Sequence, residues 1–261
     1  MSLLQLSALE FEKLLLVMLR VGGIMSVAPV FGHRNVPKMA KIGFIIIFSL
    51  ILLPTIPTRP INLPAELFGM TAVLVKEVAA GLAIGFISLM IFLAVQFAGN
   101  IIGLQMGFGI VNVIDPNSSE QVPIIGQFQF IIVMLIFLAL NGHHMVISAI
   151  SGSFQVIPLG QINFSNASAE LMIKASVNTI ALAIKLGAPC IVTMFLLSIS
   201  LGIIARTVPQ MNIFIIGFPL KIGLGLLMLG ISLPIFGYVF SKLLQGLDNN
   251  LSNLIWALRP A

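Results

Sequence analysis

Long apolar segments separated by short polar loops run through the chain and predict membrane helices. The second of these segments offers only twelve residues before a run of prolines, and the turn signal Asn141-Gly142 divides the fourth. A helix needs about 20 apolar residues to cross a bilayer. We therefore expect half-length helices whose apolar faces are buried against other helices of this chain or of other chains. The segments lie at about 14–32, 42–53, 67–104, 122–157, 175–205 and 211–240.

One polar stretch, residues 105–123, joins two long arms that carry no charge. Neither 78–114 nor 121–169 contains an Asp, Glu, Lys or Arg. Gly107 and Gly109 lie in the polar stretch and allow backbone angles that are closed to other residues. The pattern predicts a flexible loop, which we expect to carry the function while the arms hold it in place.

The predicted loop combines apolar bulk with turn chemistry. Phe108, Ile110 and Val111 offer large apolar side chains near its start. Asp115 and Pro116 favour a turn at its far side, because a continuing helix would reject this pair. Apolar constrictions of this kind exclude water and ions from a channel.

Composition places the chain among polytopic membrane proteins. Of its 261 residues 59% are hydrophobic and 8% are charged, whereas about 25% of the residues of an average soluble domain are charged. The 13 Lys and Arg outnumber the 8 Asp and Glu. The basic residues are spread along the chain, so nucleic-acid binding is not expected. Arg34, Lys38 and Lys41 share one short loop without an acid, which favours a cytoplasmic position.

Small residues recur at helical spacing in the third apolar segment. Gly81 and Gly85 stand four residues apart, and Gly99, Gly103 and Gly107 repeat this period toward the loop. Such spacing lets two helix backbones approach closely. We expect the last three glycines to form a tight packing ridge that assembly of a complex requires.

No cluster of residues predicts catalysis, a metal site or a cofactor site. His143 and His144 are neighbours, which point about 100° apart on a helix and cannot share a metal as an i, i+4 pair can. Cys190 is the single cysteine, which excludes an internal disulfide, and we expect it to be a buried apolar side chain. The sequence contains no phosphate-binding loop and no serine-nucleophile motif. We therefore interpret the protein as non-enzymatic, with no cofactor.

Charged residues interrupt the apolar segments, among them Lys76, Glu77, Lys185 and Lys221. Charges inside membrane spans are functional candidates. Glu77 is the only acid deep in an apolar run, and it lies beside Lys76, which disfavours a proton relay. We expect these side chains to lie at membrane surfaces, to reach toward water or to contact neighbouring subunits.

Four motifs resemble the R component of the flagellar type III protein export gate, the FliR family, whose counterpart in virulence secretion systems is SctT. The resemblance covers nearly the whole chain, and four ordered motifs are far more specific than a glycine pair. The motifs are AVQFAGNIIGLQMGFGIVNVIDP at 94–116, QVPIIGQF at 121–128, FLALNGHH at 137–144 and IARTVPQMNIFIIGFPLKI at 204–222.

The resemblance implies an all-α membrane protein whose broken and half-length hairpins pack into a helical multi-subunit export gate. In that family one R subunit joins about five P and about four Q subunits, and such non-identical contacts wind into an open helix. The assembly forms the entrance of the secretion channel for unfolded flagellar proteins, in the bacterial inner membrane at the flagellar basal body. The chain would be a single membrane-embedded unit, 1–261, with a P-like part, 1–173, a Q-like helical hairpin, 174–240, and a C-terminal tail, 241–261.

The resemblance also implies functional residues. The loop 105–123 would be the plug that closes the pore, and the tip of the hairpin would contact the B component, the substrate-specificity switch protein, at the cytoplasmic mouth. An A-type export component, the unfolded substrates and the lipid bilayer complete the expected partners. The gating residues would be Gly107, Phe108, Gly109, Ile110, Val111, Asp115 and Pro116, and the tip residues Arg206, Pro209, Gln210 and Asn212.

Two other functions stay open from the sequence. A secondary transporter often shows two repeated halves with a binding site at the membrane midplane, and neither repeated halves nor several membrane acids are evident here. A membrane scaffold without a pore is the other alternative. Co-purification with several copies of two small membrane proteins distinguishes an export gate from a monomeric transporter.

Overall fold

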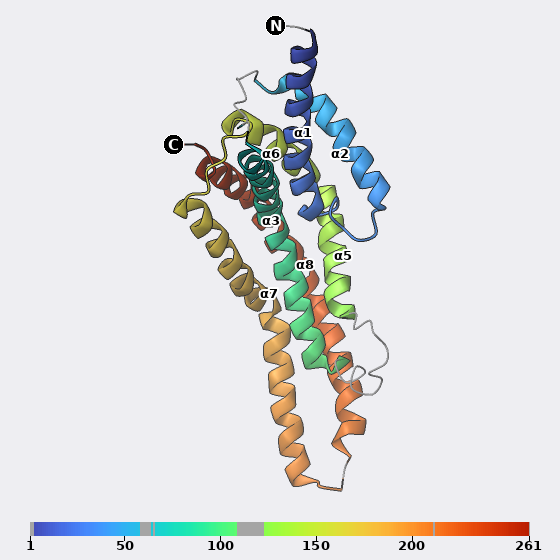
Figure 1. The fold of residues 1–261 in the computed structure, drawn as a ribbon. Coiled ribbons are helices and arrows are strands. Elements are labelled where there is room, and N and C mark those ends of the chain that lie inside the picture. The colour runs from blue at the N-terminus through green and yellow to red at the C-terminus, as the bar shows by residue number, and fades with distance from the viewer. Residues whose placement is uncertain (1–2, 58–63, 65, 109–122, 211, 261) are drawn as a thin grey trace. The chain divides into compact units, whose positions relative to one another are not determined.

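The computed structural model describes residues 3–57, 64, 66–108, 123–210 and 212–260, and these residues form helices and no β-strand (Figure 1). Four of the helices are long and apolar enough to cross a membrane, or five if α5 and α6 together count as one broken span. The predicted all-α membrane fold is therefore confirmed. The elements are α1 (Leu3–Val27), α2 (Lys38–Leu52), the 3₁₀ turn η1 (Leu53–Thr55), α3 (Leu67–Met106), α5 (Ile124–Ala139), α6 (Gly142–Val156), α7 (Asn166–Thr207) and α8 (Ile213–Ala257).

Half-length helices occur where the sequence predicts them. Helices α2, α5 and α6 have 15, 16 and 15 residues. The break between α5 and α6 lies at Asn141, whose φ of 56° is left-handed, a conformation that Asn tolerates better than most residues. The next residue, Gly142, has no room for a side chain, because a Cβ there would overlap the ring of Phe137.

Helices α3, α7 and α8 are long; α3 closely matches the expected segment 67–104, whereas α7 and α8 extend well beyond 175–205 and 211–240. They have 40, 42 and 45 residues, about 60–68 Å at 1.5 Å per residue, which is roughly twice the thickness of the hydrocarbon core. The segment 241–257, part of the C-terminal tail 241–261 that the family resemblance implies, continues α8. Its helix is amphipathic rather than wholly apolar: Leu244, Leu247 and Leu251 are buried, whereas Asp248 is exposed.

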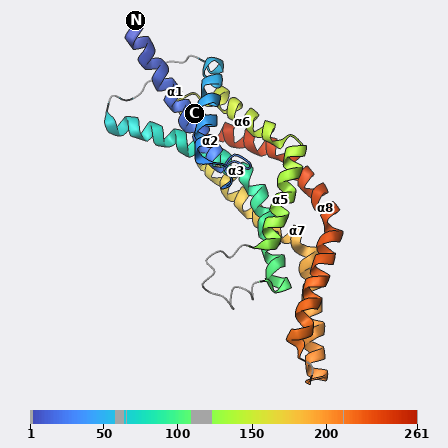
Figure 2. The same cartoon turned by 90° about the vertical axis from the view of Figure 1, so that its right-hand side faces the viewer.

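The chain forms two compact units, each assembled from separate stretches of sequence. Unit 1 comprises Met1–Met90, Phe137–Ser176 and Leu244–Ala261, and unit 2 comprises Ile91–Ile136 and Val177–Leu243. In unit 1, α1 lies against α2 (Figure 1). In unit 2, the arms of α7 and α8 run antiparallel as a hairpin in both views (Figures 1 and 2).

Glycines bring α1 and the first part of α3 into backbone contact within unit 1. A Cβ on Gly23 would lie 2.7 Å from the carbonyl oxygen of Val78, and one on Gly85 would lie 2.8 Å from that of Ile24. A Cβ on Gly81 would overlap the carbonyl of Arg20. The predicted close approach at Gly81 and Gly85 is therefore confirmed, and it is made within the chain.

A buried ion pair lies next to this glycine contact. Arg20 Nε donates to Glu77 Oε2 at 2.7 Å and Arg20 Nη2 donates to Glu77 Oε1 at 3.1 Å, with both side chains fully buried. Glu77 Oε1 also accepts a hydrogen bond from the backbone N–H of Gly160 at 2.7 Å. The expectation that Glu77 lies at a membrane surface or subunit contact was wrong, because α1 supplies a buried partner; its neighbour Lys76 is exposed.

Arg20 also caps the end of α6. Its Nη1 donates to the carbonyls of Ser153 and Ile157 at 3.1 and 3.0 Å, and its guanidinium lies 4.6 Å from the ring centroid of Phe154. Cations near a helix C-terminus stabilise carbonyls that have no partner within the helix. One side chain therefore ties α1, α3 and α6 together.

Unit 2 contains a second glycine contact, between α3 and α5. A Cβ on Gly99 would lie 2.6 Å from the Cα of Gly126, and one on Gly126 would overlap Oδ1 of Asn100. Beside this crossing Ile102, Met106, Ile125, Cys190, Met194 and Leu229 form a hydrophobic core. Cys190 is buried, as expected from the sequence.

Replacing Glu77 with Gln should lower the free energy of unfolding by about 3–5 kcal/mol, because it leaves the buried Arg20 charge without its counter-charge. Thermal or denaturant unfolding of the full chain in detergent measures the change. Glu170→Gln is the matched control, since it breaks the exposed 2.7 Å pair with Lys174 and should cause no measurable loss. Equal unfolding curves for the two variants would contradict a stabilising role for the buried pair.

Gly99→Ala should lower the free energy of unfolding by about 1–3 kcal/mol, because the new methyl group meets the backbone of α5 and forces it to shift. Gly230→Ala, in α8 of the same unit, is the control: its Cβ meets nothing within 4 Å, and alanine is the better helix former by about 1 kcal/mol. The same unfolding assay compares them. A Gly99 variant as stable as the Gly230 variant would show that the contact contributes little.

Candidate functional site

The predicted loop begins where α3 ends, at Gly107. This residue has a φ of 93°, and its N–H donates to the carbonyl of Leu104 at 3.1 Å. A Cβ here would lie 2.8 Å from Cε1 of Phe218 on α8. The backbone angle and the packing against Phe218 both favour glycine at this position. The sequence predicts the unusual backbone angle but not the packing.

Most of the predicted gating residues lie outside the residues that the structure describes. These are Gly109, Ile110, Val111, Asp115 and Pro116. Phe108 is described, and its partly buried side chain packs against the core of unit 2 formed around Ile102 and Met106. The start of the loop is therefore anchored in this core.

The three glycines of the predicted ridge meet different neighbours within unit 2. A Cβ on Gly99 would meet the backbone of Gly126 on α5, one on Gly103 would lie at an ordinary contact distance of 3.6 Å from Ile125, and one on Gly107 would meet the ring of Phe218. Only Gly99 makes the tight helix crossing. Whether the ridge also serves assembly stays a prediction.

Two amide side chains lie at the crossing of α3 and α5, and the sequence did not indicate them as site residues. The atoms Asn100 Oδ1 and Gln129 Oε1 are buried and have no hydrogen-bond partner among the described residues. Each lies against the glycine of the opposite helix, Asn100 against Gly126 and Gln129 against Gly99. Gly126 and Gln129 stand three residues apart, so they lie on the same face of α5. This spacing was the signal in the sequence for the contact between α3 and α5.

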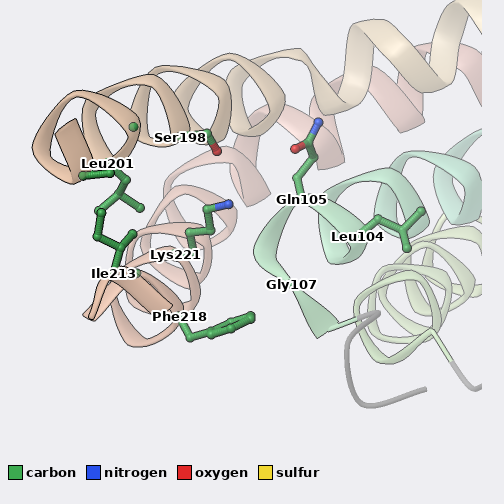
Figure 3. Close-up of a pocket in the computed structure, with 11 residues that line it drawn as sticks. Leu104, Gln105, Gly107, Ser198, Leu201, Ile213, Phe218 and Lys221 are labelled. Atoms are coloured by element: carbon green, nitrogen blue, oxygen red, sulfur yellow. The ribbon is translucent and has the colours of Figure 1, made fainter. Parts of the chain in front are cut away.

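A pocket of about 590 Å³ lies in unit 2 at the end of α3, against the α7–α8 hairpin. Figure 3 shows Gln105, Ser198 and Lys221 directed toward the same space, with Leu201 and Ile213 at one side. Its wall is mostly apolar, and among the described residues that line it Lys221 is the charged one. The lining residues are Leu104, Gln105, Gly107, Ser198, Leu201, Gly202, Ala205, Ile213, Gly217, Phe218 and Lys221.

The four predicted tip residues lie together at the turn between α7 and α8 (Figure 2). Arg206, Pro209, Gln210 and Asn212 are all exposed. Arg206 occupies the last turn of α7, where a cation complements the negative end of the helix dipole. The tip therefore presents polar groups and one positive charge, which suits contact with another protein.

The two histidines give no sign of a metal site. The rings of His143 and His144 lie 4.2 Å apart in the first turn of α6. In the described part of the chain, no three His, Cys, Asp or Glu side chains gather to hold a metal ion.

Comparison with known proteins places the chain in a family. The profile described as "Bacterial export proteins, family 1" matches residues 11–247. The flagellar biosynthetic protein FliR of Bacillus subtilis (strain 168) is 38% identical over 248 residues, which are 94% of this chain and 95% of the relative. The protein of the same name from Escherichia coli (strain K12) is 30% identical, over 91% of this chain and 90% of the relative. The chain therefore belongs to family 1 of the bacterial export proteins, the family of flagellar biosynthetic protein FliR, and is a membrane component of flagellar protein export.

Proposed function

We propose that the chain is the R subunit of the flagellar type III export gate in the bacterial inner membrane. One copy joins about five P and about four Q subunits through non-equivalent contacts. Together they form the entrance of a channel for unfolded flagellar proteins, and the loop 105–123 closes that channel. The B component contacts the hairpin tip, and an A-type export component belongs to the same apparatus.

One observation supports the proposal that the loop closes the channel. Both flanks of the loop are held in place within unit 2. On one flank, α3 ends at Gly107 with Phe218 against it, and Phe108 packs on the core. On the other, Gly126 holds α5 against Gly99. Fixed flanks with glycine at the start suit a loop that moves across an opening and returns to one place.

The uncovered apolar surface supports assembly with other subunits. Helices α7 and α8 expose many large apolar side chains in the isolated chain; Phe195, Ile203, Ile215 and Ile231 are each exposed by more than half. Both helices are also too long for one crossing of the hydrocarbon core. Neighbouring subunits would cover the length that lipid does not.

The P-like and Q-like division is part of the same proposal. The hairpin of α7 and α8 supports a Q-like element at 174–240, and it is joined to a P-like part at 1–173. The compact units follow a different division, because α3, α7 and α8 each contribute to both. The P-like and Q-like parts are therefore defined by similarity to the P and Q subunits, not by independent folding.

Glu77 disfavours the secondary transporter. Its carboxylate holds two hydrogen bonds from Arg20 and one from Gly160 N–H. Among the described residues it is the buried acid, and these contacts engage both of its oxygens. A proton relay needs an acid that is free to change partners.

Deleting residues 107–110 should leave the complex assembled but make the inner membrane leak ions, because the anchored start of the seal is removed. Ion conductance of cells or planar bilayers that carry the complex measures the leak. Gly230→Ala, which changes an open helix surface, should stay tight. A deletion complex that assembles and does not leak would contradict the plug assignment.

Gentle detergent extraction should give one copy of this chain with several copies of two small membrane proteins. Native mass spectrometry of the tagged full chain measures the copy numbers, which we expect at about five and about four for a heterologous helical assembly. A stable monomer that moves a small solute into liposomes would favour a transporter instead.

A further inference from the structure

We propose that the pocket at the end of α3 binds one anionic phospholipid, with the phosphate at Lys221 and an acyl chain along the apolar wall. The site lies wholly within unit 2, on α3, α7 and α8. Lipid binding does not depend on channel closing: Gln105 and Gly107 at the start of the loop 105–123 line the pocket, but Lys221 and most of the other lining residues belong to α7 and α8.

Three polar side chains from three helices converge on one part of the pocket: Gln105 from α3, Ser198 from α7 and Lys221 from α8 (Figure 3). Ser198 Oγ donates to the carbonyl of Met194 at 2.9 Å. The side chains of Gln105 and Lys221 have no hydrogen bond or ion pair to any described residue. Their N–H groups are therefore available to the oxygens of a phosphate.

Among the described residues of unit 2 the charged side chains are all positive. Its described residues include the cations Lys185, Arg206, Lys221 and Lys242 and no Asp or Glu. Lys221 is half-buried, whereas the other three are exposed. A partly desolvated ammonium without a counter-charge gains more from an anion than a hydrated one does, so Lys221 is the cation at which a phosphate is most stabilised.

The rest of the pocket suits an acyl chain. Leu201, Ile213 and Phe218 line it, and Gly202 leaves its wall open because a Cβ there would meet nothing within 4 Å. A volume of about 590 Å³ falls in the range of ligand pockets with apolar walls and a few polar groups. A free phosphate would leave this apolar wall uncovered, whereas a phospholipid satisfies both parts.

The membrane supplies such a ligand in excess. Basic pockets between membrane helices bind anionic lipid headgroups, and a surrounding bilayer keeps occupancy high by mass action. The carboxylate of a partner subunit would also neutralise Lys221 but would not by itself fill the apolar wall. The lipid is therefore the occupant that the combination of charge and shape favours.

The test measures lipid bound to the full chain in the complex with which it co-purifies. After delipidation, phosphatidylglycerol or phosphatidylcholine with identical acyl chains is added, and native mass spectrometry counts the bound molecules. The native chain should bind phosphatidylglycerol at least about tenfold more tightly than phosphatidylcholine. Lys221→Gln should remove this preference, and Lys185→Gln, which changes an exposed cation on α7 away from the pocket, should keep it.

A second variant tests the apolar wall. Gly202→Leu fills the open side of the pocket and keeps Lys221, so it should weaken binding of both lipids. Inorganic phosphate at millimolar concentration should not displace phosphatidylglycerol.

Four results would overturn the proposal. Equal binding of the two lipids, or equal loss in the Lys221 and Lys185 variants, would remove the specific site. Displacement by inorganic phosphate would indicate an anion site without a lipid. Loss of a partner subunit from Lys221→Gln, with lipid binding unchanged, would assign Lys221 to a protein carboxylate. None of these outcomes bears on the ion leak, so the channel proposal stands or falls separately.

Discussion

The chain has more apolar surface than its own fold buries, and this excess shapes the rest of the structure. Every segment that enters lipid satisfies its backbone hydrogen bonds internally, which explains why the described residues form helices. Yet α3, α7 and α8 are about twice as long as a hydrocarbon core is thick. Large apolar side chains along α7 and α8 stay exposed in the isolated chain. We propose that neighbouring subunits cover the part of this surface that lipid does not.

Within each unit, a few close contacts rather than general apolar packing select one arrangement of the helices. Apolar side chains slide past one another at little cost in lipid, whereas backbone contacts at glycine and buried ion pairs have one geometry. In unit 1 the Arg20–Glu77 pair and the contact at Gly23 and Gly81 have this role. In unit 2 the contact of Gly99 with Gly126 has the same role. This contact lies beside the flanks of the predicted plug, which need to be rigid.

Local features were predictable from the sequence, and long-range ones were not. The break at Asn141-Gly142, the short α2 and the positive φ of Gly107 depend on neighbouring residues. The Arg20–Glu77 pair joins residues 57 positions apart, and no periodicity connects them, although an arginine inside an apolar segment was a signal for a buried partner. The continuation of α8 was missed because its amphipathic end resembles a polar tail. Gly109 to Pro116, the centre of the predicted plug, lie outside the described residues, so their role stays a prediction.

We propose that residues 105–123 of one R subunit lie across an export channel. Electron cryomicroscopy of the closed complex, purified with all its membrane subunits, tests this position. We expect density for this loop across the channel axis, with its flanks held by α3 and α5 and its apolar side chains at the narrowest point. A loop on the outer surface of the complex, facing lipid while another element closes the channel, would show that the loop is not the plug.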